Sequence, residues 1–146
     1  MVKLFSIKEH YSELIFNREK KVEFRRQNVN INKDETCLIY TSSPVKKLTG
    51  YFIVKEKLRL PIPKLWARTK DIAGITKKEF LAYFEGCKEG TAIVFKFVKR
   101  FVRAVGLNNL RQKVREFRPP QSYYSLDKEI AFKFLSILGE EKLLFS

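Results

Sequence analysis

Residues 91–105 (TAIVFKFVKRFVRAV) form the longest stretch with strand character, and they restrict the possible folds more than any other part of the chain. Phe95 and Phe97 alternate with Lys96, which is the two-residue period of a β-strand. A strand of this length must curl within a small domain, which favours a barrel over a flat sheet. Phe101 continues the strand spacing, and we expect these phenylalanines to pack in the core.

The remaining elements follow from the same periodicity. A second long strand at residues 48–60 contains Gly50, where we expect a bend or bulge. Shorter strands are expected at residues 4–7, 20–26 and 37–40, and helices at residues 9–16, 62–68, 76–86, 107–114 and 127–139. Thr76–Glu79 has the pattern of a capping box, and residues 117–124 read as a loop. Short helices between strands predict a mixed α+β domain built on a β-barrel.

Basic residues surround a single acid in the strand expected at residues 20–26 (KKVEFRR). The two apolar residues point to one face of such a strand, whereas Lys21, Glu23 and Arg25 point to the other. A carboxylate between two cations can hold those cations in place or act on a ligand that they attract. The same row also fits a solvated surface, because charged side chains are mostly exposed.

The chain is strongly basic, with 30 lysines and arginines against 16 acidic residues and a net charge of +14. Half of this excess lies in residues 96–118, where eight basic residues and one acid give +7. Concentrated positive charge attracts polyanions and gains free energy from counterion release. Nucleic acid is therefore the expected partner. The basic run of Arg111, Lys113, Arg115 and Arg118 is expected to follow its phosphates, although a solvated helix face has the same pattern.

The cysteine and histidine content predicts no metal centre. Cys37 and Cys87 stand far apart without a CxxC motif, and His10 is the single histidine. We expect free thiols in a reducing compartment, no cofactor, and a surface position for His10. We also expect no signal peptide, and no stretch reaches the roughly 18 apolar residues of a membrane span. The expected location is the cytoplasm, away from the membrane.

Two stretches together resemble the ASCH domain family, small β-barrel proteins related to PUA RNA-binding domains. Residues 6–26 (SIKEHYSELIFNREKKVEFRR) are similar to its opening motif, a GxK turn followed by a KxxExR strand, with Lys20, Glu23 and Arg25 at its Lys, Glu and Arg. Residues 41–52 (TSSPVKKLTGYF) resemble its second segment, and the LW, ITKKEFLAYFEG and PPQSY stretches resemble its longer branch. The resemblance implies a single ASCH domain over residues 1–146, a PUA-like β-barrel with short flanking helices.

The resemblance also implies a cleft for RNA or nucleobase-containing ligands. Some ASCH members are amidohydrolases that remove an acetyl group from modified cytidine with a Lys, a Thr and a Glu, and others are ribonucleases. Lys20 matches that lysine, but Glu23 stands at the position of the threonine. Near the family's glutamate this chain has Ala73, with Asp71 two residues away. Loss of the hydroxyl nucleophile disfavours the amidohydrolase activity.

One departure from the family concerns the turn before the KxxExR strand. Arg18 stands where the family usually has glycine. We expect the turn to be made by Asn17, the residue best able to adopt the left-handed conformation, or by a less strained geometry. The effect of the extra cation on the cleft is left open.

The leading interpretation is an RNA-binding ASCH protein with a role in regulating translation or transcription, whose cleft takes a single-stranded or modified nucleotide. The candidate nucleic-acid-binding residues are Lys20, Lys21, Arg25, Arg26, Ser42, Arg111, Lys113, Arg115, Arg118, Gln121, Ser122 and Tyr123. The alternative is an enzyme on RNA or modified nucleosides, a ribonuclease or an acetylcytidine-type amidohydrolase, with Lys20 and Glu23 as catalytic acid and base. A protein-interaction domain is the third interpretation. The oligomeric state is left open.

Structural roles compete with binding at several of these positions. Glu23 and Arg25 could form an ion pair that closes the mouth of the barrel. Ser42 could serve only its turn, and residues 121–124 could only fasten the last helix to the barrel. Trp66 is expected to pack in the core rather than to stack on a base.

Overall fold

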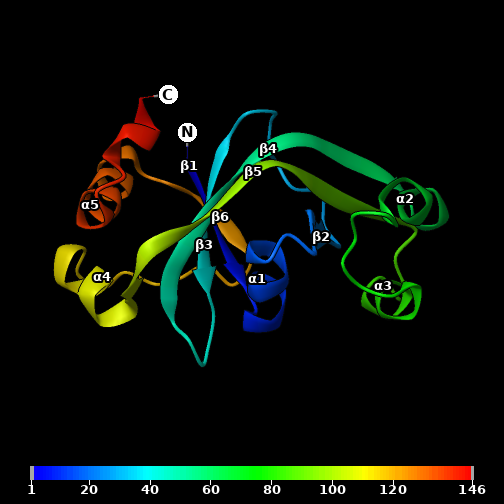
Figure 1. The fold of residues 1–146 in the computed structure, drawn as a ribbon, viewed down its shortest axis with the longest axis horizontal. Helices are drawn as coiled ribbons and strands as arrows, with labels where there is room; N and C mark the ends of the chain where they lie inside the picture. Colours follow the sequence, from blue (N-terminus) through cyan, green and yellow to red (C-terminus); the bar gives the residue numbers. More distant parts are fainter. Residues whose placement is uncertain (1, 146) are drawn as a thin grey trace.

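The computed structural model describes residues 2–145, and its elements lie in or beside one sheet (Figure 1). In chain order they are β1 (Val2–Ile7), α1 (Glu9–Phe16), β2 (Val22–Arg25), β3 (Thr36–Thr41), β4 (Lys47–Pro61), α2 (Ile62–Thr69), α3 (Lys77–Tyr83), β5 (Glu89–Gly106), α4 (Leu107–Lys113), β6 (Tyr123–Leu126), α5 (Lys128–Leu138) and the 3-10 helix η1 (Glu141–Leu144). The strand order is β2-β5-β4-β3-β1-β6. β1 and β3 are parallel, and the other neighbours are antiparallel. The predicted α+β class is confirmed.

The two longest strands, β4 and β5, form the centre of the molecule. They contain 15 and 18 residues and pair along nearly their whole length. Their register shifts between Leu48 and Gly50, which confirms the bulge predicted at this glycine. A Cβ atom on Gly50 would lie 2.4 Å from the Lys99 carbonyl oxygen and 2.5 Å from Phe16 Cε1. The missing side chain therefore allows α1 to pack directly against the sheet.

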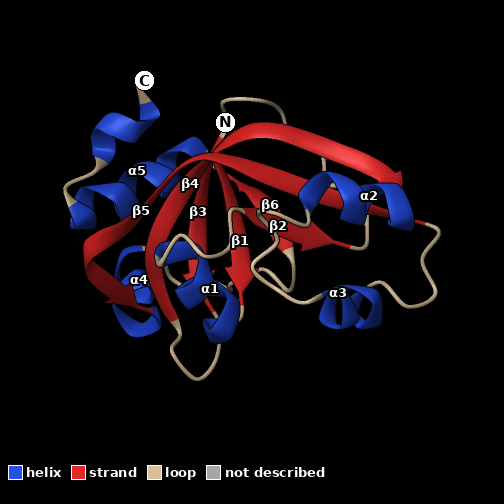
Figure 2. Cartoon of the chain, turned by 45° about the vertical axis from the view of Figure 1, so that its right-hand side comes forward, coloured by secondary structure: helices blue, strands red, loops and turns tan. Residues whose placement is uncertain are grey.

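The sheet is not closed into a barrel, so that part of the prediction is wrong. β2 and β6 stand at opposite ends of the strand order, and each has four residues. β6 itself begins within the segment predicted as a loop, and it pairs with β1. Side chains rather than a backbone ladder connect these edges: Arg25 donates to Ser122, and Tyr123 Oη accepts from the Asn30 amide. The long strands bend as expected (Figure 2), but their short outer neighbours leave the curve open.

Apolar side chains pack in three groups around this bent sheet. One lies against α4 and α5, one against α1, and one joins β2 to α2 and α3. Phe95 and Phe101 are buried as predicted, but Phe97 is 45% exposed, so its core assignment is wrong. Phe97 packs beside Tyr51 at the surface instead. Trp66 packs on Phe80 in the third group, with part of its ring exposed.

The helix ends agree with the local sequence signals. Thr76 and Glu79 form both hydrogen bonds of the capping box at the start of α3. Asp127 caps α5, and Gly139 ends it with φ +69°. Within residues 2–145, no helix is both long enough and apolar enough to cross a membrane.

Candidate functional site

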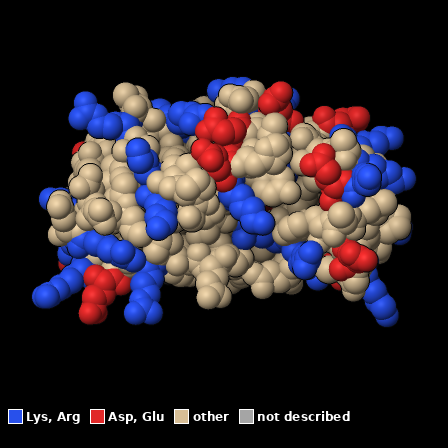
Figure 3. Space-filling view, turned by 90° about the horizontal axis from the view of Figure 1, so that it is seen from below, with Lys and Arg blue, Asp and Glu red and all other residues tan. Residues whose placement is uncertain are grey.

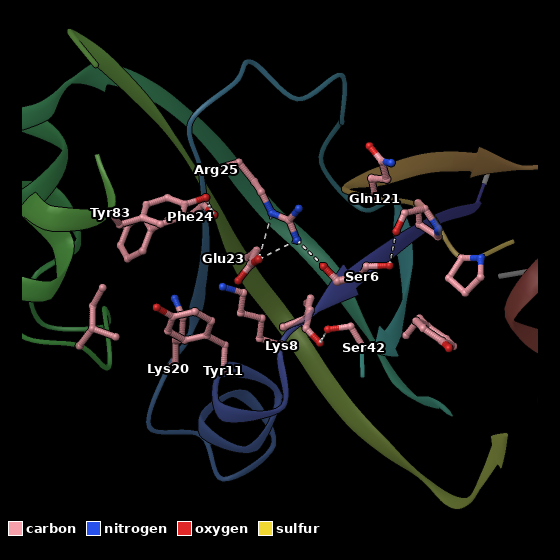
Figure 4. Close-up of a pocket in the computed structure, with 15 residues that line it drawn as sticks. Ser6, Lys8, Tyr11, Lys20, Glu23, Phe24, Arg25, Ser42, Tyr83 and Gln121 are labelled. Carbon is pink, nitrogen blue, oxygen red and sulfur yellow. Dashed lines mark hydrogen bonds and ion pairs between the residues drawn. The ribbon is translucent and has the colours of Figure 1, made fainter. Parts of the chain in front are cut away.

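A cavity of about 350 Å³ opens where α1, β2 and α3 face the loop that leads into β6. Its volume lies at the lower end of the range for small-molecule sites. Figure 4 shows Lys20, Tyr11 and Tyr83 at one end of this pocket and Ser42 and Gln121 at the other. The structure therefore brings together side chains that are distant in sequence.

Lys20 forms part of the buried wall of the pocket. Its side chain packs against Gly74, and a Cβ atom on Gly74 would lie 2.6 Å from the Lys20 Cβ atom. The ammonium group donates to the Val22 carbonyl at 2.7 Å and lies 4.5 Å from the centre of the Phe24 ring. Lys20 is only 2% exposed. Burial lowers the pKa of Lys20 to about 8, although the negative charge of Glu23 opposes this change.

Glu23 and Arg25 form a nearly buried ion pair beside Lys20. Arg25 Nη2 lies 2.8 Å from Glu23 Oε2, and Arg25 Nε donates to the same oxygen at 3.0 Å. Among the interactions of the described residues, Glu23 uses this oxygen alone, so Oε1 can accept from a ligand. The expected carboxylate between two cations is only half formed, because Lys21 is exposed and does not line the pocket.

Arg25 also holds the two edges of the sheet together. Its Nη2 donates to the Ser6 carbonyl at 3.0 Å, and its Nη1 donates to Ser122 Oγ at 2.9 Å and to the Ser122 carbonyl at 3.4 Å. Together with the Nε bond to Glu23 these make four hydrogen bonds, and Nη2 is also in ion-pair contact with Glu23, so most of the five N–H groups of the guanidinium are engaged within the protein. This geometry supports the structural interpretation of Arg25, as a bridge across the opening, over direct phosphate binding.

Of the other predicted residues near the pocket, some line it and others do not. Ser42 and Gln121 line the pocket, and Ser42 Oγ donates to the Ile7 carbonyl at 3.4 Å. Ser122 is engaged by Arg25 and by Gln27. Arg26 lies outside the lining, where its Nε donates to the Tyr83 carbonyl at 2.6 Å.

Tyr123 and the basic run lie away from the pocket lining. Tyr123 stacks on Phe5 with ring centres 5.2 Å apart, and its hydroxyl accepts from the Asn30 amide. Arg111 donates to the Phe117 carbonyl, which fixes the start of the loop after α4. The other members of the run, Lys113, Arg115 and Arg118, are exposed. Pro119 and Pro120 follow directly and line the pocket, so the run leads to its rim.

Sequence reasoning missed several residues of the pocket, including Tyr11, Tyr40, Tyr83 and Lys8. Tyr11 and Lys8 belong to the opening motif at residues 6–26, so the motif itself signals their position. Tyr83 has no such signal, because the packing of α3 on β2 brings it to the pocket. Its hydroxyl donates to the Phe24 carbonyl at 3.0 Å. Burial is the largest cause that raises the pKa of Tyr83 and of Tyr11.

The sulfur and imidazole groups take no part in this site. Cys37 and Cys87 are free thiols, and burial raises the pKa of Cys37. His10 is exposed and contacts the Tyr11 ring. Across residues 2–145, no three His, Cys, Asp or Glu side chains are placed to hold a metal ion together.

These features define a class of small α+β proteins in which a bent sheet opens into a pocket lined by a lysine, a glutamate and tyrosines. The sequence profile of the ASCH domain matches residues 5–142. The chain therefore belongs to the ASCH domain family.

Known relatives cover nearly the whole chain. An "ASCH domain-containing ribonuclease" from Zymomonas mobilis is 27% identical over 137 residues, which span 94% of this chain and 92% of that protein. A crystal structure of ASCH from Zymomonas mobilis aligns with a TM-score of 0.86 at 27% identity, over 93% of this chain and 94% of that one.

Two further matches are more limited. The large ribosomal subunit protein uL22 of Ureaplasma parvum is 36% identical over 78 residues, which cover 53% of this chain and 25% of that protein. The N-terminal domain of Staphylothermus marinus McrB aligns with a TM-score of 0.61 over 92% of this chain and 93% of that one, at 10% identity. The latter likeness concerns the fold alone.

Proposed function

We propose that this protein binds single-stranded RNA and that the pocket receives one nucleotide. The observation that carries the proposal is the position of the Lys20 ammonium in the lining of a nucleotide-sized cavity. One of its three N–H groups donates to the Val22 carbonyl. Its remaining donors face acceptors of a ligand. The rings of Tyr11, Phe24 and Tyr83 line the same cavity and offer flat apolar surface to a base.

The polar groups of the pocket have distinct roles in this proposal. Lys20 donates to an acceptor on the nucleotide, and Glu23 Oε1 accepts from one of its N–H or O–H groups. Arg25 positions Glu23 rather than touching the ligand. Ser42 and Gln121 lie where they can contact the sugar or the phosphate.

RNA is supported as the ligand by the Zymomonas relative, which is named as a ribonuclease and matches over nearly the whole chain. The shape of the site favours an unpaired strand, since a base must leave a duplex to enter a pocket.

Binding can be tested with a labelled single-stranded RNA of mixed sequence. The wild-type protein is expected to bind, and Lys20→Met is expected to lose about tenfold or more in affinity, because a charge-assisted hydrogen bond is worth roughly 1.5–3 kcal/mol. Lys133→Met on α5 is a matched control, as Lys133 is exposed and far from the pocket lining. Equal affinity of all three proteins would remove the pocket from the proposal.

Cleavage of RNA is the second candidate function, and the lowered pKa of Lys20 favours it. In this scheme the Glu23 carboxylate takes the proton of a ribose 2′-hydroxyl, and the 2′-oxygen attacks the adjacent phosphorus. The bond to the 5′-oxygen breaks, and the Lys20 ammonium gives that oxygen its proton. A lysine with a pKa of about 8 is a stronger acid at neutral pH than an ordinary lysine. The products are a 2′,3′-cyclic phosphate and a 5′-hydroxyl.

Incubation of pure protein with end-labelled RNA separates the two functions. A ribonuclease cuts the RNA, and Lys20→Ala and Glu23→Gln lose the cut while Lys133→Ala retains it. Tight binding with intact RNA identifies a binding module. The amidohydrolase alternative is not supported, because Glu23 replaces the threonine and Ala73 is fully buried in a packing cluster. Acetylated cytidine as a substrate would reveal that activity directly.

A further inference from the structure

Two groups of exposed cations flank the pocket on opposite sides. The α3-side group is Arg18, Lys21, Lys70, Lys77 and Lys78. The α4-side group is Lys113, Arg115 and Arg118. Within residues 2–145, no member of either group forms an ion pair, so their charge is available to a polyanion.

The α3-side group is part of the pocket rim because two segments pack against each other there. The Lys21 amide donates to the Ile72 carbonyl at 2.9 Å, and Gly74 lies against Lys20. Ile75 then lines the pocket, and α3 begins two residues later with Lys77. The chain thus carries basic residues outward from the wall that contains Lys20.

The α4-side group reaches the pocket through the opposite wall. Pro119, Pro120 and Gln121 line the pocket directly after Arg118. Ser6 Oγ donates to the Pro120 carbonyl at 2.6 Å, which fixes this wall to β1. Figure 1 places α4 and α3 toward opposite ends of the molecule, with α1 and β2 between them.

The acidic residues on these segments do not cancel the positive charge. Glu19 and Asp71 accompany the five α3-side cations, Glu116 accompanies the three α4-side cations, and Glu79 is engaged in the capping box. Figure 3 shows basic side chains at both ends of the face seen from below, with acidic side chains between them. A strand that crosses this face meets favourable charge in both directions.

We propose that a single RNA strand crosses the mouth of the pocket, so that the nucleotide inside is internal to the chain and its flanking phosphates contact both groups of cations. This inference rests on the proposed RNA binding. If the nucleotide in the pocket were the end of the RNA, the strand would extend from the pocket in one direction. Its phosphates would then reach only one of the two groups of cations. Basic residues on both sides would then have no common ligand.

Charge reversal on each side tests the two contacts separately. The variants are Lys77→Glu with Lys78→Glu, Lys113→Glu with Arg115→Glu, and the control Lys133→Glu with Lys142→Glu, whose residues are exposed on α5 and η1. Both flanking variants are expected to bind a single-stranded 12-mer at least about tenfold more weakly than wild type, since phosphate contacts dominate affinity. Their affinity for a mononucleotide should stay unchanged. Wild-type affinity for the 12-mer in either flanking variant overturns the inference.

A circular single-stranded RNA tests the internal position, because it has no ends. If the strand crosses the pocket, the circle binds about as tightly as the linear form, and Lys20→Met weakens both. If linear RNA depends on Lys20 but the circle does not bind, the pocket takes a chain end and this inference alone fails. If Lys20→Met binds linear RNA like wild type, the proposed function fails instead.

Discussion

The guanidinium of Arg25 joins parts of the fold that no backbone ladder connects. It links β2 to the Ser6 carbonyl at the end of β1 and to Ser122 just before β6. Glu23, its ion-pair partner, is 6% exposed and lies 2.8 Å from this guanidinium. Loss of Arg25 therefore leaves the buried Glu23 carboxylate without its partner. It also removes the hydrogen bonds that join β2 to Ser6 and Ser122.

Arg25→Ala is expected to destabilise the protein by about 3–5 kcal/mol, the range observed when one member of a buried ion pair is removed. The double variant Arg25→Met with Glu23→Gln should lose less, because no uncompensated charge stays buried. Urea denaturation followed by circular dichroism measures both free energies of unfolding. If the single variant is as stable as the double variant or more stable, the unpaired Glu23 carboxylate is not the cause of the lost stability.

Lys20 should make the free energy of unfolding depend on alkaline pH. Burial lowers its pKa from 10.5 to about 8, so between these values the unfolded chain holds the proton and the folded chain does not. Stability contributed by this group then rises with pH over that window. Lys20→Met lacks this pH-dependent contribution, so the free energy of unfolding of wild type should rise relative to that of the variant by about 2 kcal/mol between pH 7 and pH 10. A constant difference across this range, in urea denaturation at each pH, would contradict the lowered pKa.

The sequence motif located the pocket better than it explained the roles within it. Lys20, Glu23 and Ser42 were predicted together and line one cavity, because the motif places Lys20 just before β2, Glu23 on β2 and Ser42 at a turn. The commitment of Arg25 to Ser122 could not be predicted, since the two residues lie 97 positions apart. Tyr83 was missed for the same reason, as it reaches the pocket through tertiary packing.

At the scale of single elements, the turn between α1 and β2 carries backbone strain that the sequence only partly revealed. The left-handed residue is Arg18, with φ +65°, whereas Asn17 has φ −79°, so the prediction for Asn17 is wrong. The amides of Glu19 and Lys20 both donate to the Leu14 carbonyl, which fixes the turn around Arg18. This chain therefore holds an arginine in a conformation that a glycine would adopt without strain.

Arg18→Gly is expected to stabilise the protein by about 0.5–1 kcal/mol, because a non-glycine residue pays roughly 1–2 kcal/mol in this conformation and glycine loses more entropy on folding. Thermal unfolding measures the effect. Arg18→Ala is the control, since it removes the same side chain but keeps the strain. Equal gains in both variants would assign the effect to the guanidinium rather than to the backbone.

Elements with local signals were predicted well, and those that depend on distant partners were not. The α3 capping box and the Asp127 and Gly139 ends of α5 follow from short-range hydrogen bonds, and the structure confirms them. β6 was read as a loop because its strand character comes from pairing with β1. The prediction of a closed barrel was wrong for the same reason. The lengths of β2 and β6 are set by pairing with distant strands rather than by local sequence.

At the scale of the whole molecule, charge pairing changes which cations can bind RNA. Lys96, Lys99 and Arg100 form ion pairs with Asp34, Glu140 and Glu13. Three of the eight basic residues in the 96–118 segment are therefore engaged within the protein. The charge of +7 read from the sequence overstates what this segment offers to phosphates.

The salt dependence of RNA affinity should reflect this reduced number. Each neutralised phosphate of a single strand contributes about −0.7 to the slope of log affinity against log salt concentration. Contacts to roughly four to seven phosphates predict a slope of about −3 to −5 between 50 and 200 mM salt, far less steep than about −10 for a protein that used all of a +14 charge. Fluorescence anisotropy with a labelled single-stranded RNA measures it. A flat dependence would show that the cations flanking the pocket do not contact phosphate, and a slope near −10 would show that the paired cations leave their acids to bind RNA.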